Sequence, residues 1–318
     1  MKHHWDDWLD RESGLFQFSE NLQRGMYNFP DLAEIPKTST SLTITSATKN
    51  WERLSQFAHL EELTLHEPSG QQFQLLAALP WLKRLRLTFF GPTDLEPLRS
   101  LHALEELVLE YVSKFDDLSP LVGLPKLQGV HFENLRRVHD FSVFSGSAIR
   151  TLTIIGTTDW EQPIDSLDFL AEMPRLERFR SWCSRIGGEA PVLAGLAKSK
   201  VSYFSLRENA VPLVDFAWLV AKRPDLRGSI PYVAEEWIDD HYRPEIHAKK
   251  ETTPGMSAEE KKRIKDHNTM TRYYWPEVVF LGKGERRVKS CDSEERVRLI
   301  RAHEAKFESL VLDCRLQE

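Results

Sequence analysis

Cysteine is scarce in this sequence, and the three that occur are widely separated. Cys183, Cys291 and Cys314 are odd in number and share no close spacing. They therefore provide neither a disulfide framework nor the paired spacing of a zinc site, which favours a reducing compartment.

Long apolar runs are absent as well. No stretch approaches the roughly 18 apolar residues that a membrane-spanning helix requires. The start, MKHHWDDWLD, lacks the apolar region of a secretory signal. We therefore expect a cytoplasmic protein with no membrane insertion, although export by a route without a cleavable signal would leave the same pattern.

The sequence also has no excess of positive charge. It contains 42 Lys and Arg residues and 48 Asp and Glu residues, which gives a net charge of -6. Proteins dedicated to nucleic acids usually have a clear basic excess, so we expect no nucleic-acid partner.

Motifs for catalysis or cofactor binding are missing too. The histidines show no HExxH or similar metal-ligand spacing. LGKGERRVK at 281–289 does not match the phosphate-binding loop G-x-x-x-x-G-K-[ST], and we interpret it as an ordinary hairpin loop. Cys291 precedes a predicted helix, as some nucleophilic cysteines do, but a plain thiol is the simpler interpretation. We expect no enzyme activity, no cofactor and no metal.

What the sequence does contain is a repeat. The strand-like pattern L-x-x-L-x-L is clearest as LEELTL at Leu60, LKRLRL at Leu82 and LEELVL at Leu104. The second apolar positions of eight copies are 42, 63, 85, 107, 130, 152, 179 and 204. By subtraction, successive gaps are 21, 22, 22, 23, 22, 27 and 25 residues. The two longest gaps indicate insertions, around 156–166 and 183–191.

This period is typical of leucine-rich repeats, in which a short strand is followed by a helical turn. The chain resembles the roughly 22-residue class of bacterial internalins. The segments between strands match the family pattern D-L-x-P-L-x-x-L-x-x-L as DLEPLRSLHAL at 94–104 and DLSPLVGLPKL at 117–127. The resemblance covers roughly residues 39–230. It implies an α/β solenoid with a parallel concave sheet, and it specifies no activity.

An open solenoid needs caps at both ends. We predict an N-terminal cap at 1–38, a leucine-rich repeat domain at 39–231 and a C-terminal mixed α/β capping extension at 232–318. The apolar residues of 1–38 can form a lid, and capping signals at Ser257 and Asp292 predict two helices in the extension. A second functional domain in 232–318 is the alternative. One departure from the family is the loss of its asparagine ladder, which apolar residues such as Val112 and Leu135 replace.

The polar positions between the strand leucines should face outward on the concave side. One interpretation is a solvated face with neighbouring charges paired, since Arg84 and Arg86 lie between acidic rows. The other is a recognition surface, because Arg, Trp and Tyr dominate measured interface energetics. The candidate partner-binding residues are Arg84, Arg86, His131, Arg178, Arg180, Trp182, Tyr203 and Arg207.

These observations predict a non-enzymatic protein–protein interaction module that binds a protein partner, of unknown identity, on the concave face. Two alternatives stay open. One is an immunity or antitoxin-type protein that neutralises a toxin. The other is a translocated bacterial effector with an activity in the C-terminal extension.

Overall fold

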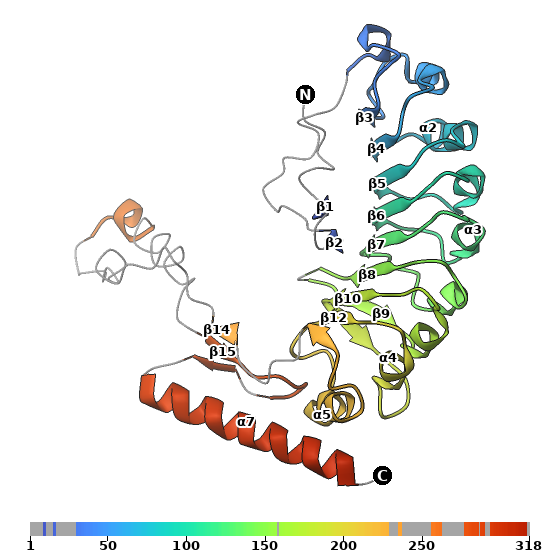
Figure 1. Ribbon diagram of the computed structural model, residues 1–318. Coiled ribbons are helices and arrows are strands. Elements are labelled where there is room, and N and C mark those ends of the chain that lie inside the picture. The colour runs from blue at the N-terminus through green and yellow to red at the C-terminus, as the bar shows by residue number, and fades with distance from the viewer. Residues whose placement is uncertain are drawn as a thin grey trace.

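The computed structural model describes residues 9–10, 15–16, 30–157, 159–228, 235–236, 256–262, 277–285, 287–289 and 293–316. Its central feature is a nine-stranded parallel sheet whose strands follow one another in chain order. The sheet lines one side of a curved array and short helices line the other (Figure 1). The predicted leucine-rich repeat solenoid is therefore confirmed. Its strands are β3 (Ser41–Thr45), β4 (Glu62–His66), β5 (Arg84–Phe90), β6 (Glu106–Val112), β7 (Gly129–Glu133), β8 (Thr151–Ile155), β10 (Arg178–Trp182), β12 (Tyr203–Leu206) and β13 (Arg227–Gly228).

Between the strands the chain returns through short helical turns, most of them 3₁₀. Leucines recur every third residue there, which matches the three residues per turn of a 3₁₀ helix. Leu95, Leu98 and Leu101, in and beside η4 (Glu96–Ser100), are all fully buried. The other turns are η2 (Trp51–Gln56), α2 (Gly70–Gln74), η3 (Leu75–Ala78), α3 (Ser119–Val122), η5 (Ser142–Phe144), η6 (Asp168–Glu172), α4 (Ala194–Lys198) and α5 (Leu213–Lys222).

The leucines of the strands and of the helical turns share one interior. Leu107 of β6 is aligned with Leu85 of β5 and with Val130 of β7, and all three are fully buried. Each repeat buries its leucines against the next one, so the core continues along the array.

The asparagine ladder is replaced as the sequence predicts, because Val112 and Leu135 are buried at its positions. A buried glutamine from one insertion supplies part of the missing polar contacts. Gln162 accepts a hydrogen bond from the Leu135 amide at 2.9 Å and donates one to the Val138 carbonyl at 2.6 Å. The turn after β7 is thus satisfied by a side chain from the next repeat.

Both predicted insertions are present. They contain β9 (Gln162–Ile164) and β11 (Ser184–Ile186), which pair with each other in a separate parallel sheet. The second insertion therefore pairs with the first, and Trp182 at the end of β10 keeps part of its surface exposed.

At the N-terminal end, η1 (Leu32–Glu34) closes the first repeat, and Leu32 is fully buried. Asp31 caps this turn and accepts a hydrogen bond from the Asn50 side chain at 2.7 Å. Of the predicted lid before residue 30, the structure describes only β1 (Leu9–Asp10) and β2 (Leu15–Phe16). They pair antiparallel, and β2 lies against β8 on the concave side (Figure 1). The other apolar residues of that lid lie outside the described residues.

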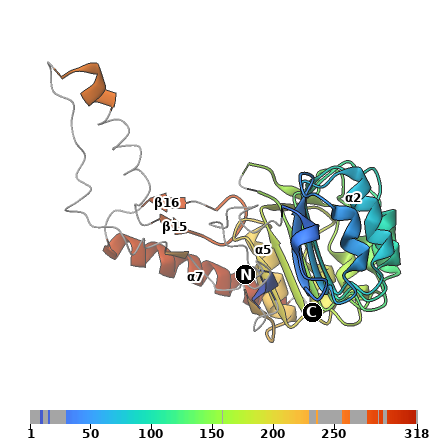
Figure 2. The same cartoon turned by 90° about the horizontal axis from the view of Figure 1, so that it is seen from above.

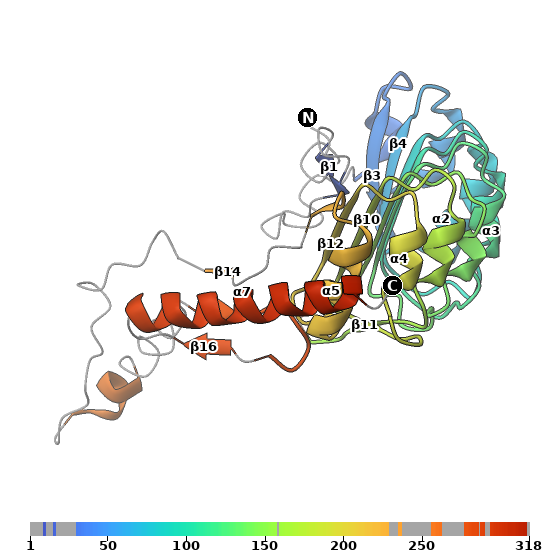
Figure 3. The same cartoon turned by 60° about the horizontal axis from the view of Figure 1, so that its bottom comes forward.

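At the C-terminal end, a long helix, α7 (Ser293–Leu316), packs against α5 (Figures 1 and 3). Phe307 is 2% exposed and joins the core of the array, whereas Val297 is 45% exposed. The strands β14 (Glu235–Glu236), β15 (Glu277–Val279) and β16 (Arg287–Lys289) form a small antiparallel sheet beside α7 (Figure 2). The mixed α/β extension is therefore confirmed, and its helix packs on the array through Phe307 and Val311.

The hairpin expected around 281–289 is also present, since β15 and β16 pair antiparallel across it. Its turn is tied to the array by two backbone hydrogen bonds of 2.7 Å, from Gly282 to the Glu208 carbonyl and from Lys283 to the Val211 carbonyl. At Ser257 the predicted capping box forms with Glu260. Cys291 and Asp292 lie outside the described residues.

Candidate functional site

The concave face of the sheet consists of three rows of side chains in register. The first row contains Glu62, Arg84, Glu106, Gly129, Thr151, Arg178 and Tyr203. The middle row contains Thr64, Arg86, Val108, His131, Thr153, Arg180 and Ser205. The third row contains His66, Thr88, Glu110, Glu133, Ile155 and Trp182. Because alternate residues of a strand face one side, each row brings together side chains about 22 residues apart in sequence.

Part of the middle row is buried. Its residues lie on the concave side as expected, but the expectation that all of them are exposed to solvent is wrong. Arg86 is 2% exposed and His131 is fully buried. One cause is pairing across strands, since Arg86 contacts Glu110 on β6 at 2.5 and 3.1 Å. Burial lowers the pKa of His131 to about 3, so this imidazole is neutral at physiological pH.

Arg84 in the first row is held between two carboxylates on neighbouring strands. Its Nε lies 3.0 Å from Glu106 on β6, and its Nη1 pairs with Glu62 on β4. Burial alone would lower the pKa of Arg84, but the two carboxylates raise it above its ordinary value. The predicted internal pairing of Arg84 and Arg86 is therefore confirmed, and the charges of both are compensated inside the sheet.

The other end of the sheet is different. Arg178, Arg180, Trp182, Tyr203 and Arg207, which we call the arginine–aromatic cluster, lie on or just after the neighbouring strands β10 and β12. All five are partly exposed.

Within the arginine–aromatic cluster each ring has an arginine beside it. The guanidinium of Arg180 lies 5.3 Å from the centroid of the Trp182 ring, and that of Arg178 lies 6.0 Å from the Tyr203 ring. Trp182 is oriented by its indole Nε1, which donates to the Ser205 hydroxyl at 2.8 Å. The cluster is thus an ordered arrangement of rings and cations.

Arg180 has no carboxylate partner among the residues that the structure describes. Burial lowers the pKa of its guanidinium below the ordinary value, and Tyr203 offsets only part of that effect. Its positive charge also contributes to the lowered pKa of His131. By contrast, Arg207 lies 3.6 Å from Glu208 and donates to the Cys183 sulfur at 3.7 Å. The cluster therefore contains a partly desolvated and uncompensated cation.

One neighbour of the cluster was missed by the sequence reasoning. Arg227 of β13 is aligned with Tyr203 in the first row and is exposed. The signal for this ninth strand was present, because Pro224 precedes Leu226 by two residues, as Pro80, Pro125 and Pro174 precede the first leucines of earlier strands.

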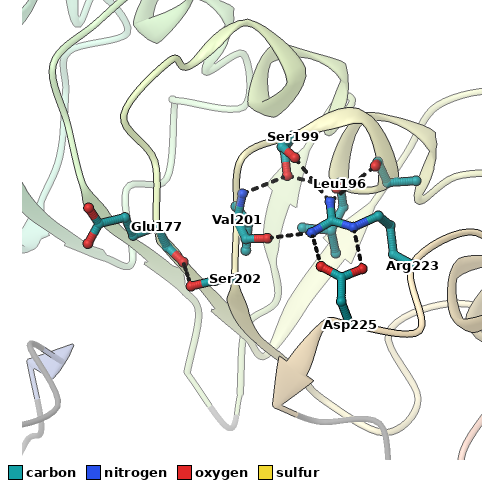
Figure 4. A network of polar contacts seen from close by, with 8 residues as sticks. Glu177, Leu196, Ser199, Val201, Ser202, Arg223 and Asp225 are labelled. Carbon is teal, nitrogen blue, oxygen red and sulfur yellow. Dashed lines mark hydrogen bonds and ion pairs between the residues drawn. The ribbon is translucent and has the colours of Figure 1, made fainter.

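A polar network around Arg223 connects the segments that lead into these last strands (Figure 4). Arg223 donates to the carbonyls of Ser199 and Val201, both at 3.0 Å, and pairs with Asp225 at 2.8 Å. Ser202 donates to the Glu177 carbonyl at 3.3 Å. Arg223 thereby joins the chain before β12 to the chain before β13, which sets the positions of Tyr203 and Arg227.

Three further observations concern other kinds of site in the described parts of the chain. No three His, Cys, Asp or Glu side chains there are grouped to hold a metal ion. None of the helices described combines the length and apolar character that crossing a membrane requires. A hollow of about 430 Å³ on α7 is lined by Glu294, Val297, Arg298 and Arg301 from a single helix.

Comparison with known proteins yields structural likeness only. No protein-family model matches the sequence, and no curated protein matches it. Internalin C2 from Listeria monocytogenes is 24% identical, with a TM-score of 0.38, over 48% of this chain and 64% of its own. Internalin F from the same species is 17% identical, with a TM-score of 0.42, over 60% of each chain. TLR13, solved as a complex with ssRNA13, is 13% identical, with a TM-score of 0.34, over 54% of this chain and 33% of its own.

The matched regions cover less than two thirds of each of these solved chains. The fold assignment rests on the repeat and the parallel sheet of this chain itself.

Proposed function

We propose that this protein is a non-enzymatic interaction module that binds a protein partner on its concave face, with the arginine–aromatic cluster as the main contact. One observation carries the proposal. Arg180 is a partly buried cation without a carboxylate partner among the described residues, and it lies beside the partly exposed ring of Trp182.

Retaining a desolvated charge costs stability unless something pairs with it. Arg84 and Arg86 of the same sheet have such partners. Sites that break the rules of stable packing are often functional sites. Trp, Tyr and Arg are also the residue types that contribute most at protein interfaces. The accessible residues of the predicted set are therefore the interface we propose: Arg84, Arg178, Arg180, Trp182, Tyr203 and Arg207. Arg86 and His131 are left out because they are buried.

The test is a quantitative affinity capture with the full chain. The wild type, an Arg180→Ala/Trp182→Ala double variant and an Arg99→Ala control are immobilised in equal amounts, and the bound proteins are compared by mass spectrometry. Arg99 is an exposed arginine that pairs with Glu96 within η4, far along the chain from the cluster. We expect one protein to be enriched equally by the wild type and the control and to be lost from the double variant. Identical recovery by all three would refute the proposed site.

The effector alternative predicts a cleft of converging polar groups in the C-terminal extension. Phe307 and Val311 of α7 instead pack into the core of the array, as a cap would. This packing supports the interaction module over a separate activity in the described part of the extension.

A further inference from the structure

Resting on the proposed function, we propose that the arginine–aromatic cluster receives an acidic segment of the protein partner, whose carboxylate pairs with the guanidinium of Arg180. The inference concerns the chemistry of the partner, and it follows from charge, geometry and the composition of the rest of the face.

The charge balance changes along the sheet. In the N-terminal half, Arg84 lies between Glu62 and Glu106. In the C-terminal half, Arg178, Arg180 and Arg227 have no ion pair with any residue of the described chain. Three arginines on β10 and β13, the strands on either side of β12, thus have no ion-pair partner in the described chain, in a protein whose net charge is -6. The missing counter-charge is best supplied by a ligand.

The geometry suits a carboxylate. A guanidinium can bind a carboxylate through two parallel hydrogen bonds, and such charge-assisted pairs are stronger when water is excluded. Trp182 and Tyr203 lie on either side of Arg180, in the third and first rows, and so provide apolar walls for the bound group. The strands β10, β12 and β13 span roughly 10 Å at a spacing of about 4.8 Å, which matches about three residues of extended peptide.

The rest of the face argues against a long polyanion such as RNA. In the N-terminal half, the first row contains the partly exposed Glu62 and Glu106 on either side of the single Arg84, so this part of the row has a net negative charge. A nucleic-acid strand that continued along the sheet would meet these carboxylates, and its phosphates would be repelled. A short acidic peptide segment can instead occupy the basic end alone.

The experiment uses the full chain, labelled with ¹⁵N, and observes the indole N–H signal of Trp182. The Trp182→Phe variant identifies this signal. Three probes are titrated: the peptide acetyl-(Glu-Gly)₃-amide, its neutral analogue acetyl-(Gln-Gly)₃-amide, and a uridine hexanucleotide. Each is tested on the wild type, on Arg180→Gln and on Arg99→Gln as the matched control. Thermal unfolding of each variant establishes that it is folded.

We expect the glutamate peptide to bind at least tenfold more tightly than the glutamine peptide. Arg180→Gln should reduce its affinity to the glutamine level, Arg99→Gln should leave it unchanged, and added salt should weaken it. Equal binding of both peptides would overturn the inference, and so would tighter binding of the hexanucleotide. If no probe moves the Trp182 signal, the acidic partner is refuted, while the affinity capture still tests the proposed function independently.

Discussion

The contrast between Arg86 and Arg180 leads to a prediction about stability. Both are middle-row arginines, but only Arg86 has a carboxylate partner among the described residues. Its side chain is 3% exposed, and that of Glu110 is fully buried. Arg86→Met leaves the Glu110 carboxylate buried without its arginine. Breaking a buried pair from one side costs about 3–5 kcal/mol, so we expect a loss of that size in the free energy of unfolding.

Arg180→Met should behave differently. The substitution removes a partly desolvated charge that has no ion pair in the described chain, which favours the folded state. It also removes the cation–π contact with Trp182, which is worth roughly 0.5–2 kcal/mol at a partly desolvated site. These effects oppose each other, so the free energy of unfolding should change by less than about 1 kcal/mol, in either direction.

The assay is urea unfolding at pH 7, followed by circular dichroism and by tryptophan fluorescence. Arg99→Met serves as the control, because its exposed pair with Glu96 should be worth less than about 0.5 kcal/mol. Equal destabilisation by Arg86→Met and Arg180→Met would refute the argument, because it would mean that Arg180 is compensated in the folded protein. In that case the main support for the acidic partner would be lost as well.

Three further predictions concern His131, the repeat core and α7. Since the pKa of His131 falls to about 3 on folding, the unfolded state binds the extra proton between about pH 3 and 6.5, and stability falls as the pH drops through this window. Between pH 7.5 and 5, the free energy of unfolding of His131→Gln should therefore fall by roughly 2 kcal/mol less than that of the wild type, as measured by urea unfolding. An equal fall in both proteins would contradict a buried neutral imidazole. Leu107→Ala should cost about 3–5 kcal/mol in a single cooperative transition, because this side chain is fully buried between two strands; a cost below about 1 kcal/mol would contradict the shared core. Phe307→Ala should lower stability by about 3–5 kcal/mol if α7 is an integral cap, whereas an unchanged melting temperature would indicate that α7 is not needed to close the array.

Much of the repeat array was predictable because its signals are local and recur. Leucines at every third position required the helical turns, and the alternating pattern that followed required the strands. The alignment of Arg178 with Tyr203 followed from repeat spacing alone, and the structure has this register. Arg227 lay within reach of the same reasoning through Pro224.

The exposure of the concave residues was not predictable in this way. Position in the repeat specifies which side of the sheet a residue faces, but not what lies over it. Arg86 and His131 were expected on an open surface, and both are buried. Pairing is equally non-local: Arg86 reaches Glu110, which lies one strand over and one row away. The pairing of the two insertions as β9 and β11 also depends on segments about 20 residues apart.

The sequence by itself determined that this chain stacks leucine-rich units into one parallel array, because no unit can bury its leucines alone and the period sets how neighbours align. Only the tertiary structure decided which charges of that array are compensated. Two arginines of the same row, Arg86 and Arg180, differ in whether a carboxylate of the described chain lies within ion-pairing distance. That difference depends on how side chains on neighbouring strands are directed, and not on the spacing of residues along the sequence.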